Sequence, residues 1–85
     1  MSAAEPAVRY EIVAEADAAA SRYGPFASTH EAYGVLTEEV AELLDAIRAN
    51  ALESVREEAI QVAAVAMRLA ECCRGLPGFA ERSGP

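Results

Sequence analysis

Apolar and small residues recur every three or four positions along three stretches of this chain, the spacing of a helix with one buried side. The first stretch covers residues 6–23. Pro6 suits the first turn of a helix, because the amide hydrogen that proline lacks has no partner there. Gly24 and Pro25 end the stretch. The pattern predicts a first helix over residues 6–23, whose apolar side consists largely of alanine.

The second predicted helix covers residues 29–49. Ser28 and Glu31 have the spacing of a capping box, in which the serine hydroxyl accepts from a free backbone amide and the glutamate reaches back to another. Asn50 suits the left-handed conformation that ends many helices. The large apolar residues of this segment fall within an arc of roughly 100° around the helix axis. They are Leu36, Val40, Leu43, Leu44 and Ile47.

The third predicted helix covers residues 54–74. Its start lies between Leu52 and Ser54, and Ser54 and Glu57 form a second possible capping box. Glycine and proline are frequent after residue 74, which predicts an irregular tail over residues 75–85.

The short connection between the second and third helices predicts an antiparallel helical hairpin, with the first helix packed across it. We therefore expect an all-α fold in which residues 1–85 form one domain. A chain of 85 residues hides only roughly 60–65% of its unfolded surface when it folds. The helix over residues 54–74 is apolar on several sides, so we expect two or four copies of the chain to assemble into a shared helical bundle.

The charge of the chain excludes several classes of partner. It contains 14 acidic residues and 7 basic ones, all of them arginine, and its net charge is −7. Nucleic acids and anionic membranes repel such a surface, so neither is expected as a partner. We see no secretory signal at the N-terminus. The apolar run after Glu58 is interrupted by Gln61 and Arg68 and is too short to cross a bilayer. A cytoplasmic protein is expected.

Acidic residues are concentrated in the second helix. Glu38, Glu42 and Asp45 lie at positions i, i+4 and i+7, which predicts that they share one face, and Glu39 lies at the edge of that face. Like charges at this spacing destabilise a helix by a few tenths of a kcal/mol per pair. A bound cation would relieve this repulsion.

The third helix places one further acid on its predicted inner side. Glu58 begins an apolar stripe, and Gln61 lies one turn later. A buried carboxylate costs several kcal/mol unless it is paired or bound to a metal. Two interpretations follow from the residues alone: a Mg²⁺ site between the two helices, or a solvated acidic face. The stripe consists of Glu58, Val62, Val65, Leu69 and Cys72.

The cysteines and the histidine indicate packing and surface roles. Cys72 and Cys73 are adjacent, and a disulfide between adjacent cysteines is strained. The sequence contains neither a CxxC motif nor cysteine and histidine at the spacing of a metal site. We interpret both as packing residues near a helix end. His30 lies in the first turn of the second helix and is interpreted as a surface residue.

The stretches FASTHEAYGVLTEEVAELLDAI and REEAIQVAAVAMRLAE resemble the MazG-like, all-α nucleoside triphosphate pyrophosphatases, and look closest to small members of actinobacterial and phage type. That family carries E-x-x-E on one helix and E-x-x-D on the next. Here Glu39 and Glu42 match the first motif, preceded by Glu38, and Glu58 begins the second. The resemblance covers about residues 26–74.

The resemblance implies an enzyme that uses Mg²⁺, or Mn²⁺, to hydrolyse a nucleoside triphosphate to the monophosphate and pyrophosphate, and the expected assembly of two or four copies would make it a homodimer or homotetramer. It implies catalytic roles for Glu39, Glu42 and Glu58, one of which orients or deprotonates the attacking water. Arg68 and Arg74 are the nearest cations for the phosphates, and Arg68 is the predicted substrate-binding residue. The implied metal ligands are Glu38, Glu39, Glu42 and Glu58, with Asp45 and Gln61 as further candidates.

Gln61 departs from the family motif, which has aspartate at this position. An amide oxygen can bind Mg²⁺ but brings no negative charge. Three functions remain open: an active pyrophosphohydrolase, a MazG-like protein that binds nucleotide or metal without turnover, and a helical module for oligomerisation or partner binding.

Overall fold

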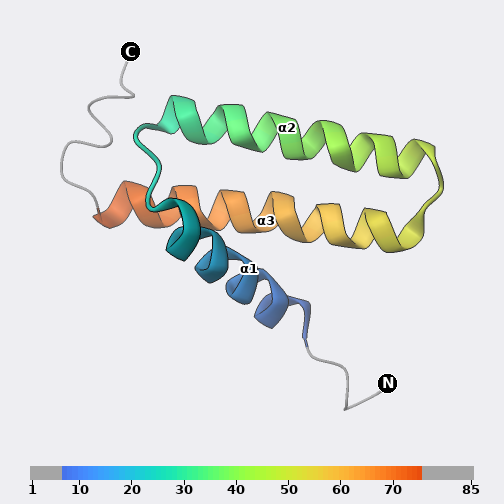
Figure 1. Cartoon of the computed structure of the whole chain (residues 1–85), viewed down its shortest axis with the longest axis horizontal. Helices are drawn as coiled ribbons and strands as arrows, with labels where there is room; N and C mark the ends of the chain where they lie inside the picture. The colour runs from blue at the N-terminus through green and yellow to red at the C-terminus, as the bar shows by residue number, and fades with distance from the viewer. Residues whose placement is uncertain (1–6, 76–85) are drawn as a thin grey trace.

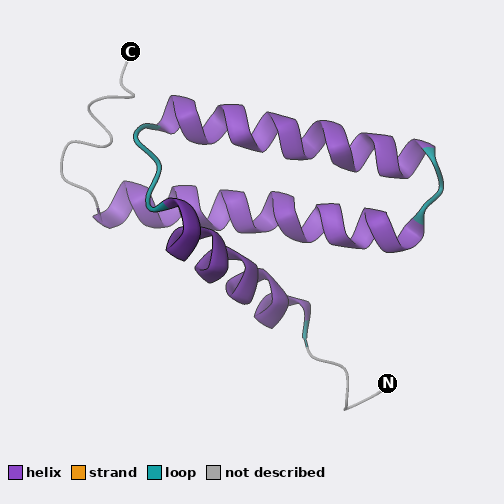
Figure 2. Ribbon diagram, in the orientation of Figure 1, coloured by secondary structure: helices purple, strands orange, loops and turns teal. Residues whose placement is uncertain are grey.

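The fold is a bundle of three helices. A computed structural model describes residues 7–75, which form α1 (Val8–Tyr23), α2 (Thr29–Arg48) and α3 (Leu52–Gly75) and contain no strand. Helices α2 and α3 run side by side as an antiparallel hairpin, and α1 crosses α3 obliquely (Figure 1). Short loops connect the helices (Figure 2). The all-α class and the hairpin predicted from the sequence are confirmed.

Local signals account for the boundaries of α2. The Ser28 hydroxyl accepts from the Glu31 amide at 3.1 Å, and the Glu31 carboxylate accepts from the Ala27 amide at 2.6 Å. The predicted capping box is therefore present, although the glutamate reaches the amide one residue before the cap. Asn50, just beyond the helix, has a φ of 56°, which confirms its predicted left-handed conformation. Gly24 ends α1 with a φ of 75°, a value that glycine adopts without strain.

The second predicted capping box is wrong. Helix α3 begins at Leu52, so Ser54 lies inside its first turn. The Val55 amide donates to the Ala51 carbonyl at 2.8 Å, which makes this the first hydrogen bond of the helix. A serine inside the first turn cannot act as the cap, because the cap residue stands before the helix.

The other predicted ends differ by one or two residues. Helix α1 begins at Val8, α2 ends at Arg48, and α3 continues to Gly75. The prediction for Pro6 and most of the predicted tail, residues 76–85, lie outside the described residues. None of the described helices combines the length and hydropathy that crossing a bilayer requires.

Helix α1 is attached to α3 by small side chains and one ion pair. Ala16 is buried, and its small side chain lets the two helices approach closely. The Arg56 guanidinium donates to both carboxylate oxygens of Glu11, with a distance of 2.9 Å from Nη1 to Oε1. This contact lowers the pKa of Glu11 below its usual value. The contact between α1 and α3 thus contains a bidentate charge pair and a buried alanine.

The core is small and lies beside the α1–α2 connection. Phe26, Ala32, Val65 and Cys72 form a buried cluster, against which Leu36 and other apolar residues pack. Cys72 is buried, in agreement with its predicted packing role, whereas Cys73 is exposed. His30 is exposed as predicted.

The apolar arc predicted for α2 is only partly buried. Leu36 and Leu43 are half-buried, but Val40, Leu44 and Ile47 are 46%, 42% and 50% exposed. The physical reason is that α2 approaches α3 through its small residues, Ala32 and Ala46, which are both buried. This contact rotates the larger apolar side chains away from the hairpin interior.

Candidate metal centre

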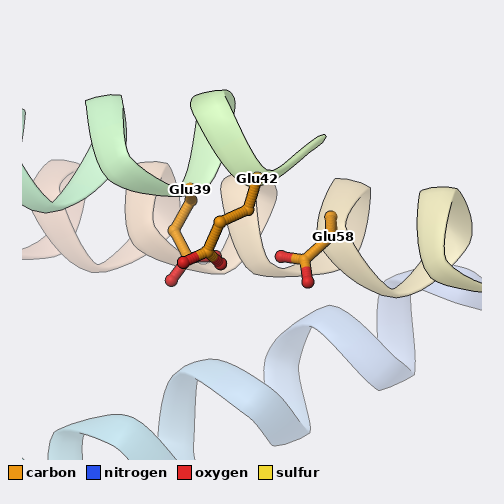
Figure 3. A group of neighbouring side chains, drawn as sticks. All are labelled: Glu39, Glu42 and Glu58. Atoms are coloured by element: carbon orange, nitrogen blue, oxygen red, sulfur yellow. The ribbon is translucent and has the colours of Figure 1, made fainter. Parts of the chain in front are cut away.

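Three carboxylates converge between α2 and α3. Glu39 and Glu42 lie one turn apart on α2, and Glu58 lies on the facing part of α3 (Figure 3). Each offers an oxygen atom such that all three oxygens lie within 4.8 Å of one another. We call these three residues the acid cluster. Because the hairpin is antiparallel, residues far apart in the sequence reach the same level of the bundle. The sequence predicted all three residues as catalytic and metal-binding, and the fold brings them together.

Two of these carboxylates carry buried oxygens without hydrogen-bond partners. Glu39 and Glu58 are half-buried, and Glu42 is exposed. The Oε1 atoms of Glu39 and Glu58 are buried and accept no hydrogen bond within the described part of the chain. An unsatisfied buried acceptor costs about 1–3 kcal/mol, and more when the group is charged. The arrangement is therefore costly unless a proton or a cation occupies it.

The electrostatics of the cluster favour taking up positive charge. Burial raises the pKa of the Glu39 carboxyl from 4.5 to about 7, and the neighbouring carboxylates of Glu42 and Glu58 add to the rise. At neutral pH, a substantial fraction of the molecules without metal therefore carries a proton on Glu39. A divalent cation can replace this proton and interact with all three oxygens.

The donor set fits a hard divalent cation. Mg²⁺ binds oxygen ligands, commonly one or two carboxylates, and keeps several waters. The two unsatisfied buried oxygens supply such ligands from two helices, and the exposed Glu42 leaves one side open to solvent. No sulfur or imidazole ligand, which softer metals prefer, belongs to this group of residues.

Two predicted ligands lie outside the cluster. Glu38 and Asp45 are exposed and do not belong to the group formed by Glu39, Glu42 and Glu58. The predicted acidic face had Glu38, Glu42 and Asp45 at its centre and Glu39 at its edge. The burial agrees with this face, since Glu38, Glu42 and Asp45 are all exposed and Glu39 turns toward α3, but only Glu39 and Glu42 of these acids lie close to Glu58.

A cleft of about 380 Å³ adjoins the cluster. Such a volume falls within the usual range of small-molecule sites, roughly 300–1,000 Å³. Glu39 and Gln61 line it, and so do Arg22, Tyr23 and Arg68. Gln61 is half-buried, so its amide borders the same space as Glu39. The residue that departs from the family motif therefore faces the candidate site.

Arg22 and Tyr23 were not predicted as site residues. They stand at the C-terminal end of α1, and nothing in their spacing indicates a site. Only the packing of α1 against α3 brings them to the cleft. The guanidinium carbon of Arg22 lies 5.5 Å from the centre of the Tyr23 ring.

Arg68 is the one buried charged residue that borders the cleft among residues 7–75. It is 7% exposed, so it is not a solvated surface arginine. Its guanidinium carbon lies 4.2 Å from the centre of the Phe26 ring, and Nη2 donates to the Gly24 carbonyl at 3.2 Å. The α1–α2 connection therefore holds the guanidinium in place.

Comparisons with protein-family models, with curated proteins and with solved structures find no match to this chain.

Proposed function

We propose that this protein is a Mg²⁺-dependent nucleoside triphosphate pyrophosphohydrolase, which converts a nucleoside or deoxynucleoside triphosphate to the monophosphate and pyrophosphate. One observation carries the proposal: Glu39, Glu42 and Glu58 converge with two unsatisfied buried oxygens at the edge of a cleft of about 380 Å³. A cation-binding acid cluster next to a small-molecule cleft suits a substrate with a polyphosphate chain. The sequence resemblance to MazG-like enzymes supports the same reaction.

The roles of the residues follow from their positions. Glu39, Glu42 and Glu58 would hold Mg²⁺, or Mn²⁺, and Gln61, which lines the cleft with Glu39, would offer its side-chain oxygen as a further, uncharged donor. When bound, the ion supplies Lewis-acid stabilisation of phosphate charge and lowers the pKa of bound water. One of the three glutamates orients or deprotonates the water that attacks phosphorus. The hairpin fixes the spacing of the acids before substrate arrives, so little reorganisation is needed at the moment of reaction.

The direct test is pyrophosphate release from a panel of ribo- and deoxyribonucleoside triphosphates, with Mg²⁺, with Mn²⁺ and with a chelator. We expect release that requires the cation. The matched variant is Gln61→Asp, which adds one negative charge beside Glu39, and we expect it to bind Mg²⁺ more tightly than the wild type. Absence of release from every nucleotide in both proteins would overturn the proposal. A nucleotide-induced rise in melting temperature without turnover would then favour the binding protein.

A second function, oligomerisation, is favoured by the surface of α2. Four of its apolar residues are exposed and share one side of the helix, at the spacing of seven, four and three residues that a helix–helix seam uses. We call this set the α2 apolar stripe: Tyr33, Val40, Leu44 and Ile47.

We propose that the α2 apolar stripe packs against a second copy of the chain, giving a homodimer or homotetramer. The stripe carries no charge, so two copies can meet on it without electrostatic repulsion, although the chain as a whole has a net charge of −7. A small core of the kind described above also gains stability from assembly. Oligomerisation is compatible with the enzymatic function and would still be present if that function failed.

We expect Leu44→Glu to shift the protein toward a monomer in analytical ultracentrifugation. The change places a charge in an apolar contact, which should weaken association by about tenfold or more, since each 1.4 kcal/mol corresponds to a factor of ten. The control is Ala18→Glu, which adds the same charge at an exposed position of α1. A wild type that is already monomeric at micromolar concentration, or equal effects of the two variants, would contradict the proposed interface.

A further inference from the structure

Within residues 7–75, Arg68 is a buried charge without an acidic partner. Its side chain is 7% exposed, and within residues 7–75 no carboxylate lies within salt-bridge distance of it. Buried charges are normally paired, because removing a guanidinium from water costs several kcal/mol. For comparison, the more exposed Arg56 is fully paired with Glu11.

The hydrogen-bonding capacity of Arg68 is also largely unused by the part of the chain that the structure describes. A guanidinium has five N–H donors in a fixed plane. One of its nitrogens donates to the Gly24 carbonyl, and the ring of Phe26 covers one face of the group. These two contacts hold the group in position without neutralising it, and Arg68 borders the cleft. The side chain is thus oriented in advance to receive an anion.

The position of Arg68 indicates the shape of the ligand. Glu39 of the acid cluster and Arg68 line the same cleft, and Glu58 of the cluster stands ten residues before Arg68 on α3, a separation of roughly 15 Å between their backbone positions along the axis. A ligand that contacts both the acid cluster and Arg68 must therefore be extended. A single phosphate ion is too short, whereas a polyphosphate chain can reach from a bound cation at one end to a guanidinium at the other.

The remaining charged groups of the cleft make binding depend on the cation. Arg22 is a second positive group on the wall, but Glu15, Glu31 and Glu39 also line it. These carboxylates oppose the entry of a free anion. A divalent cation on the acid cluster reduces this repulsion, so an anion that arrives with the cation is favoured over the anion alone.

We propose that Arg68 binds the end of a polyphosphate chain that lies away from the acid cluster, with Arg22 as a second cation on the cleft wall. This inference rests on the proposed function, since it takes the ligand to be the phosphate chain of the nucleotide. Phe26 and the Gly24 carbonyl act as positioning groups, because they hold the guanidinium toward the cleft. The specificity of the site for a chain of phosphates, as opposed to a single one, follows from the separation of its two ends.

The test measures the binding of inorganic triphosphate, which has the phosphate chain but no base or sugar, by calorimetry in excess Mg²⁺. We expect Arg68→Lys to weaken binding by about tenfold or more, because lysine cannot reproduce the planar, multi-donor geometry. Arg48→Lys, an identical change at an exposed position of α2 that does not line the cleft, should leave the affinity unchanged. The affinity for Mg²⁺ alone should be the same in all three proteins.

A second measurement does not depend on how well the variants fold. In the wild type, the Nε–H resonance of Arg68 should shift on addition of magnesium triphosphate, and that of Arg48 should not. The inference is overturned if the wild type and Arg68→Lys bind triphosphate with equal affinity, or if both variants lose the same affinity. It is also overturned if no triphosphate binds, or if the Arg68 resonance does not move.

The two proposals fail separately. If Arg68→Lys still releases pyrophosphate at the wild-type rate, the proposed role of Arg68 is refuted and the proposed enzymatic function stands. If triphosphate binds at Arg68 but no nucleotide is hydrolysed, the anion site stands and the proposed enzymatic function is refuted.

Discussion

We expect Glu58→Gln to abolish Mg²⁺-dependent pyrophosphate release and, at the same time, to raise the melting temperature of the metal-free protein. Glu58 contributes one of the three converging carboxylates and carries a buried oxygen without a hydrogen-bond partner. Removing its charge takes away a cation ligand. The loss of several kcal/mol of charge stabilisation should lower the rate by about a hundredfold or more.

The opposite effect on stability follows from the same crowding. Without metal, the Glu58 carboxylate is repelled by Glu39 and Glu42, and the glutamine has no charge to repel. We expect a gain of about 1 kcal/mol, which corresponds to roughly 4–8 °C in melting temperature for a domain of this size. In excess Mg²⁺ the difference should shrink or reverse, since a ligand that binds only the native state stabilises it.

The chain offers a matched control for this experiment. Glu57 precedes Glu58 on α3 and is exposed, outside the cluster. Glu57→Gln changes the net charge by the same amount and should alter neither pyrophosphate release nor the response to Mg²⁺. If the two variants behave alike, Glu58 is an ordinary charge near the start of a helix, where acids are mildly favourable, and the metal centre is refuted.

We expect the metal-free protein to lose stability as the pH rises from about 4.5 to about 7. The folded protein raises the pKa of Glu39 from 4.5 to about 7, chiefly by burial and then by the charges of Glu42 and Glu58. Between these two values the folded state holds a proton that the unfolded state has released. By linkage, the free energy of unfolding then falls with increasing pH.

Thermal melting at a series of pH values measures this effect. The contribution of Glu39 is fully present below pH 4.5 and is lost as the pH passes about 7. Glu39→Gln should remove it, because the amide does not titrate in this range. Glu38→Gln is the control, since Glu38 is exposed and lies outside the cluster. Identical pH profiles for the two variants would contradict the assignment.

The same proton links pH to metal binding. A cation must displace the proton from Glu39, so the affinity for Mg²⁺ should rise as the pH increases through about 7. Calorimetry in buffers of different ionisation enthalpy would detect the proton released. Glu39→Gln should bind Mg²⁺ more weakly and release no such proton.

The predictions that were confirmed rest on signals between residues close together in the chain. The capping box of Ser28 and Glu31 spans three positions, and the left-handed Asn50 marks the end of a helix through its own backbone preference. The second capping box failed although it has the same spacing. Helix α3 had already started at Leu52, and a serine at the right spacing can cap only if the chain before it is not yet helical.

The acid cluster could be predicted only in part. Glu39, Glu42 and Glu58 were identified by their residue type and by the resemblance to MazG-like proteins, but the sequence placed Glu38 and Asp45 beside them. Which of these acids lie close to Glu58 depends on how α2 is rotated about its own axis. The contact between α2 and α3 determines that rotation. Hydrophobicity favoured the large apolar residues as the contact surface, whereas the buried residues of α2 are Ala32 and Ala46.

By itself, the sequence determined the three helices, their antiparallel hairpin and the concentration of acids in the facing segments, because helical periodicity, caps and charge are local properties of the chain. Only the tertiary structure decided which side of α2 faces α3, that Arg68 is buried under Phe26 without an acidic partner among residues 7–75, and that Arg22 and Tyr23 reach the cleft. These features depend on contacts between residues that are distant in the sequence. Such contacts arise only once small side chains allow the helices to approach, which no local pattern encodes.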